Sequence, residues 1–87
     1  MIVEEVIVVR KPRAFLGAQA QDITTAANQF PSTDIFFEFG DRRHRAKSLL
    51  GLFSLGIREG DTLTVIADAP DEKTAKAAIE AMNELIA

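Results

Sequence analysis

Hydrophobic and polar residues follow one another along the chain with two spacings, one typical of strands and one typical of helices. Alternation at every second residue, together with β-branched and aromatic side chains, predicts strands at Glu5–Val9, Asp34–Phe39, Arg42–Ala46 and Asp61–Ala67. Gly40 and Asp41 form a tight turn that favours a hairpin between the second and third of these. In the third strand we expect His44 to point toward the core side, and Arg43 and Arg45 to point away from it.

Three segments have the spacing of three and four residues that places apolar side chains on one face of a helix. The first covers Leu16–Phe30, with Leu16 as the first residue of its apolar face. The second is short, because Ser48 can cap its start and Gly56 can end it. The third begins in Asp68–Glu72, with Pro70 in its first turn, and has the predicted buried face Ala75, Ala78, Ile79, Met82 and Leu85 or Ile86.

The order of elements is therefore βαββαβα. Because the strands alternate polar and apolar residues, we expect a half-buried antiparallel sheet of the α+β class, with the helices on one face. The 87 residues are enough for one domain with one core, so residues 1–87 are expected to form a single domain.

The composition excludes several classes of function. The chain has no cysteine and one histidine, His44, so we expect neither a metal site nor a cofactor. Its apolar runs are far shorter than the roughly 20 residues that span a bilayer. The start, Met1–Glu5, lacks the basic region of a signal peptide, which predicts a cytoplasmic protein without membrane contact. A net charge of −3 argues against general nucleic-acid binding.

Basic residues are nevertheless clustered. Seven of the ten lie in two groups, Arg10, Lys11 and Arg13 in the first, and Arg42, Arg43, Arg45 and Lys47 in the second. A basic patch on an acidic protein indicates an acidic partner surface or a phosphate. A solvated strand face without a function is the alternative.

The segment Ala46–Ile57 resembles one family almost residue for residue. HPr, the histidine-containing phosphocarrier protein of the bacterial sugar phosphotransferase system, has here a lysine, a serine and an apolar run interrupted by one glycine. The block then closes on a serine or threonine, a leucine, a glycine and an aliphatic residue. The chain matches at Lys47, Ser48, Gly51 and the closing Ser54–Ile57. The resemblance extends over nearly the whole chain and implies the family's open-faced β-sandwich.

The family's active segment reads glycine, isoleucine or leucine, histidine, alanine, arginine, proline, alanine, at the entry to the first helix. Without a gap, Leu16 takes the position of the phosphorylated histidine and Ala18 that of the arginine. A gapped alignment puts Gln19 at the histidine instead, which is similar to the HPr-like catabolite-repression subfamily. We prefer the ungapped alignment, since it keeps the helix phase. Neither leucine nor a glutamine amide offers a neutral ring nitrogen, so no catalytic residue is expected there.

The resemblance implies a second site at Ser48, where the family is phosphorylated for regulation. An N-cap is the simpler interpretation of this serine, and the two are compatible. In the helix that Ser48 opens, we expect Leu50 and Phe53 to be exposed and the remaining leucines to be more buried, namely Leu49, Leu52 and Leu55. Partner-binding residues are therefore predicted to be Leu49, Leu50, Phe53, Lys47 and Arg13.

The leading hypothesis is a regulatory HPr-like module that is not an enzyme and binds protein partners. The resemblance implies an HPr kinase/phosphorylase-like enzyme, a transcription regulator or phosphotransferase-system proteins, and a monomer or weak homodimer. The alternative is a working phosphocarrier that uses a displaced site such as His44, although core packing is the simpler interpretation of that residue. Nucleic-acid binding through the arginine strand ranks lowest, because Phe37 and Phe39 share the expected core face.

Overall fold

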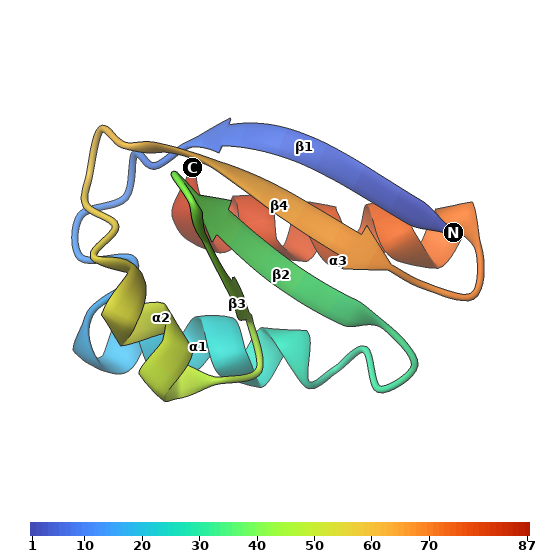
Figure 1. The fold of residues 1–87 in the computed structure, drawn as a ribbon. Helices are drawn as coiled ribbons and strands as arrows, with labels where there is room; N and C mark the ends of the chain where they lie inside the picture. The colour runs from blue at the N-terminus through green and yellow to red at the C-terminus, as the bar shows by residue number, and fades with distance from the viewer.

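The computed structural model describes all residues, 1–87, as a sheet of four strands covered by three helices (Figure 1). The elements are β1 (Ile2–Val8), α1 (Gly17–Ala27), β2 (Asp34–Phe39), β3 (Arg42–Arg45), α2 (Leu49–Leu55), β4 (Thr62–Asp68) and α3 (Glu72–Ile86). This order, βαββαβα, and the α+β class are as the sequence predicts. None of the three helices has the length and apolar character that crossing a bilayer requires.

The strands lie in the order β1-β4-β2-β3, and every neighbouring pair is antiparallel. The two free edges are therefore β1 and β3. All three helices lie on the same side of the sheet, so one face is covered and the other is open (Figure 1). Because side chains alternate along a strand, each strand contributes one set to the core and one set to the open face.

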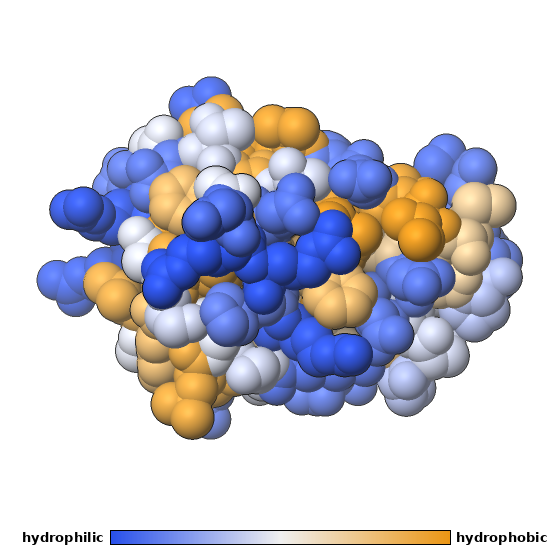
Figure 2. Space-filling model, viewed as in Figure 1, coloured by the Kyte–Doolittle hydropathy of each residue, from blue (hydrophilic) through white to orange (hydrophobic).

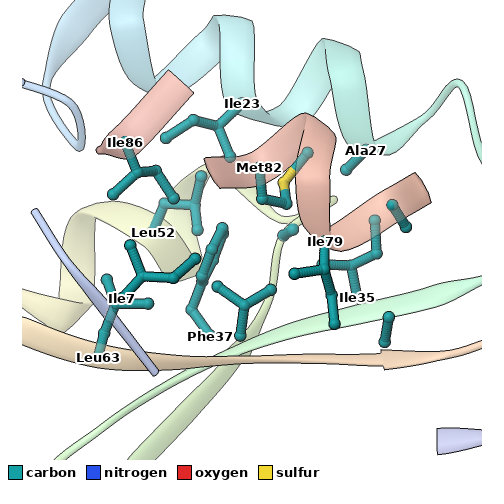
Figure 3. Close-up of a cluster of buried hydrophobic side chains, with 14 of the residues drawn as sticks. Ile7, Ile23, Ala27, Ile35, Phe37, Leu52, Leu63, Ile79, Met82 and Ile86 are labelled. Atoms are coloured by element: carbon teal, nitrogen blue, oxygen red, sulfur yellow. The ribbon is translucent and has the colours of Figure 1, made fainter. Parts of the chain in front are cut away.

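The core fills the space between the covered face and the helices. Phe37 of β2 is opposite Val65 of β4 on one side and His44 of β3 on the other. Its ring meets that of Phe15 edge to face, with centroids 5.3 Å apart, an arrangement that adds about 0.5–1.5 kcal/mol beyond burial. Figure 3 shows Phe37 pointing from the sheet toward Leu52 and the residues of α3.

The bounds of the first two elements differ from the sequence prediction. β1 begins at Ile2 and not at Glu5, because residues 2–4 pair with residues 66–68 of β4. α1 begins at Gly17 and ends at Ala27, so the prediction of Leu16–Phe30 was too long at both ends. Leu16 has an extended backbone and its side chain is 56% exposed, so the prediction that it begins the buried face was wrong.

The later boundaries shift by smaller amounts. β3 ends at Arg45, although the amide of Ala46 still donates to the carbonyl of Ile35 at 2.8 Å. β4 covers residues 62–68, one residue later than predicted. α3 begins after Asp71, whose carboxylate accepts from the Thr74 amide, so Pro70 lies before the cap and not in the first turn. That backbone hydrogen bond lowers the pKa of Asp71 below its usual value.

Two neighbouring leucines of α2 test this packing. Leu52 is fully buried and Leu50 is 80% exposed. We expect Leu52→Ala to lower the free energy of unfolding by about 2–5 kcal/mol, since it leaves a cavity in the core. Leu50→Ala is expected to change it by no more than about 0.5 kcal/mol. Urea unfolding of both variants is the measurement, and equal losses would contradict the arrangement.

Candidate functional site

The loop between β1 and α1 is anchored at the end of α3. The amides of Arg10 and Lys11 both donate to the Ile86 carbonyl, at 2.9 and 3.0 Å, and the Lys11 ammonium donates to the Glu84 carbonyl. Cations and N–H groups stabilise the carbonyl end of a helix, so the Lys11 side chain of the first basic cluster has a structural use here. Arg13 is exposed and lies in the left-handed region with φ of 60°, where its carbonyl accepts from the Leu16 amide.

The start of α1 carries no nucleophilic side chain. Leu16 is the N-cap residue, and its side chain makes no capping hydrogen bond. Gly17, Ala18 and Gln19 form the first turn, and all three are exposed. Of the two candidate positions for the histidine, Leu16 is the N-cap residue of α1, and Gln19 is the third residue of the helix. Neither side chain can accept a phosphoryl group as an imidazole does.

The start of α2 presents a hydroxyl beside apolar side chains. Ser48 is the N-cap residue, and its Oγ accepts from the Gly51 amide at 3.1 Å. The side chain of Ser48 is exposed, as are those of Leu50 and Phe53, at 80% and 42%. Leu49 is half-buried and Leu52 is buried, which agrees with the predicted division. Figure 2 shows hydrophobic surface over α2, next to the hydrophilic surface over β3.

His44 lies beneath α2 on the covered side of the sheet. Its Nε2 is 3.1 Å from Ser54 Oγ, and that hydroxyl donates to the Gly51 carbonyl at 2.8 Å. A hydroxyl has one proton, so Nε2–H must donate to Ser54. The other side of the ring lies against Gly51, where a Cβ would be 3.1 Å from Nδ1. His44 is half-buried and packed between β3 and α2.

Two arginines of the second basic cluster pair with carboxylates of the β2–β3 hairpin. Arg43 donates to Glu38 through Nε and Nη2, at 3.2 and 3.0 Å, and Arg45 donates to Asp34 through Nη1 at 3.0 Å. Lys47 donates to the carbonyls of Phe30 and Thr33, at 3.0 and 3.1 Å, and so holds the α1–β2 loop. No hydrogen bond or ion pair joins this cluster to the first one.

The sequence patterns did not predict the two arginines that lie around the Phe36 ring. The guanidinium carbons of Arg43 and Arg45 lie 5.6 and 5.2 Å from the centre of the Phe36 ring, within the range of cation–π attraction. The hairpin register places Phe36 opposite Arg45 and Glu38 opposite Arg43. The turn at Gly40 fixes that register, so counting back from it could have revealed the cluster.

No group of three or more histidine, cysteine, aspartate or glutamate side chains is placed to hold a metal ion. The candidate residues lie at the starts of α1 and α2 and on the hairpin edge at β3.

Comparison with known proteins shows the family. The family model for the PTS HPr component phosphorylation site matches residues 3–87. The chain belongs to the HPr family. It is 36% identical to the HPr-like protein Crh of Halalkalibacterium halodurans over 86 residues, which are 99% of this chain and 94% of the relative. It is 34% identical to the phosphocarrier protein HPr of Mycoplasma genitalium over 77 residues, 88% of each chain.

Solved structures of the HPr family have the same fold. The phosphocarrier protein HPr from Bacillus anthracis superposes with a TM-score of 0.89 at 28% identity, covering 99% of this chain and 98% of that one. The HPr from Thermoanaerobacter tengcongensis superposes at 0.76 with 27% identity, covering 99% and 90%. The βαββαβα arrangement is therefore that of the family.

The contact between β3 and α2 makes the HPr-family glycine at position 51 sensitive to its neighbour. A Cβ there would lie 3.0 Å from His44 Cβ. We expect Gly51→Ala to lower the free energy of unfolding by about 1–2 kcal/mol, because overpacking outweighs the gain of about 0.5–1 kcal/mol from alanine in a helix.

A double-mutant cycle with His44→Ala checks the cause. This variant removes the ring but leaves Cβ, so the cost of Gly51→Ala should fall without disappearing. A cost that is the same in both backgrounds would show that the His44 ring is not the obstacle.

Proposed function

We propose that residues 1–87 act in the cytoplasm as a regulatory, protein-binding module of the HPr family that does not carry a phosphoryl group on histidine. The observation that carries this proposal is the N-cap of α1, which is an exposed leucine, Leu16, followed by Gly17 and Ala18. In the ungapped alignment Leu16 takes the position of the histidine of the active segment, and Ala18 takes that of the arginine. A chain without the imidazole lacks the nucleophile, and without the arginine it lacks a cation for the phosphoryl oxygens.

Ser48 is the proposed regulatory site. Ser48 is exposed at the start of α2, where its Oγ accepts from the Gly51 amide. In phosphorylation by ATP, this oxygen forms a bond to the γ-phosphorus, the hydroxyl proton leaves and ADP departs. The ester would add about −1.5 to −2 charges without requiring any buried group to move. The phosphate would then act as a recognition mark on an unchanged fold.

The proposed partner surface adjoins Ser48. Leu50 and Phe53 supply exposed apolar area, and Leu49 supplies a half-buried border. Arg13 is exposed at the entry to α1, so its charge is available to an acidic partner. The ammonium of Lys47 is already bonded to two carbonyls, which leaves its stem as the part that a partner can contact.

The partners that we propose are proteins: an HPr kinase/phosphorylase-like enzyme, a transcription regulator or other phosphotransferase-system proteins. Two relatives bear the name HPr-like protein Crh, and two Mycoplasma relatives bear the name phosphocarrier protein HPr, so similarity by itself does not choose between the two roles. The residues at the start of α1 support the role without a phosphocarrier histidine. We propose no role for nucleic acid or membrane. We propose that the protein is a monomer or a weak homodimer.

The displaced phosphocarrier is disfavoured by the surroundings of His44. Phosphorylation would require a ring nitrogen that is free and accessible. Nε2 is bonded to Ser54, and the Nδ1 side lies against Gly51.

A phosphoryl-transfer assay tests the missing nucleophile. With the family's upstream donor, we expect no acid-labile, base-stable label on the wild-type protein or on His44→Ala. The double variant Leu16→His, Ala18→Arg should gain label, since it restores the imidazole and the cation. Label on the wild type that disappears in His44→Ala would establish the displaced carrier instead.

Intact mass after incubation with the family's serine kinase and ATP tests the regulatory site. We expect a gain of one phosphoryl group that is abolished in Ser48→Ala and retained in Ser54→Ala. The two serines lie at opposite ends of α2, which makes Ser54 a matched control. An unmodified wild-type protein, or a gain that survives Ser48→Ala, would contradict the proposal.

A further inference from the structure

A hollow of about 330 Å³ opens beside Ser48, at the free edge of the sheet. Its lining residues are Phe36, Arg43, His44, Arg45 and Ser48. β3 has no neighbour beyond it, so side chains of the open face and residues of the α2 side reach the same space around this edge. Two arginines and one serine therefore share one hollow on an otherwise acidic protein.

The backbone fixes Arg45 close to Ser48. The amide of Ser48 donates to the Arg45 carbonyl at 3.0 Å, so the two residues are the ends of one turn. The guanidinium of Arg45 is held over the Phe36 ring, 5.2 Å from its centre. An arginine that is already ordered loses less side-chain entropy when it binds an anion.

The two arginines differ in the donors they have left. Arg43 uses both Nε and Nη2 on Glu38, whereas Arg45 uses only Nη1 on Asp34. A guanidinium has five N–H donors, so Arg45 keeps Nε and Nη2 for a further anion. It can accept a second partner without leaving Asp34.

We propose that this hollow is an intramolecular phosphate site, in which Arg45 donates to the phosphate ester of phosphorylated Ser48. The proposal rests on the proposed phosphorylation of Ser48 and says where the new charge goes. The phosphate is the ligand chemistry that fits, because a dianion with three strong acceptor oxygens matches the free N–H donors of an arginine. Arg45 would fix the phosphate at the edge of β3 and thereby orient the mark that a partner reads.

A double-mutant cycle measures the coupling. Phosphoserine is inserted at position 48 during translation, so no kinase is needed, and each protein is compared with its unmodified form. Arg45→Gln is the test variant, and Arg42→Gln is the matched control, because it removes the same charge from the same strand outside the hollow. The measured quantity is the equilibrium constant for unfolding in urea.

We expect the phosphate to be coupled to Arg45 by about three- to ten-fold in that constant, the range of an exposed, charge-assisted pair. Coupling to Arg42 should stay below about two-fold, as expected of a charge outside the hollow. The Nε–H signal of Arg45 in a proton–nitrogen spectrum should also shift on phosphorylation, while that of Arg42 should not. Equal couplings for the two arginines, or an unmoved Arg45 signal, would overturn the site. A failed kinase assay would contradict the proposed function. It would not affect the measured coupling between the phosphate and Arg45, because the phosphoserine is inserted without a kinase.

Discussion

The burial of one sheet face beneath three helices determines the place of His44 and of the β3 arginines. A strand exposes alternate side chains on opposite faces, so the register of β3 with β2 sends His44 inward with Phe37 and sends Arg43 and Arg45 outward around Phe36. A shift of one residue would exchange the two sets. The same constraint that builds the core therefore also builds the arginine cluster, although the two share no side chain.

α2 packs closely on β3 at Gly51, where a Cβ would lie 3.0 Å from His44 Cβ. Gly51 lets the helix lie directly on His44, and Ser54 then accepts a hydrogen bond from the ring while donating to the carbonyl of the same glycine. This packing fixes the helix at its middle, and Ser48 fixes it at its start. The His44 ring is thereby engaged in packing and hydrogen bonding between β3 and α2.

Most of the fold could be predicted because its strands are rich in β-branched and aromatic residues and partly alternate polar and apolar side chains. β2 has the predicted bounds, and the helix-side residues of β4, Leu63, Val65 and Ala67, are all buried. The errors lie where a distant element decides. Residues 2–4 become strand because they pair with residues 66–68 of β4. Leu16 lies outside the buried helical face because it is the N-cap residue, with an extended backbone. For the site, exposure within α2 followed from helical spacing, but the bonds of Lys47 to the α1–β2 loop required the tertiary structure.

The starts of α1 and α2 are held by different contacts. This separation matters because the proposed loss of histidine phosphorylation concerns α1, whereas the proposed serine phosphorylation concerns α2. The mouth of α1 depends on the loop that bonds to the end of α3, whereas the start of α2 depends on Ser48, Gly51 and the edge of β3. No hydrogen bond joins Leu16 to Ser48. A substitution at Leu16 therefore breaks no hydrogen bond at the start of α2. Under the proposed function, the chain has lost its nucleophile at α1 and keeps at α2 an exposed serine beside exposed apolar side chains.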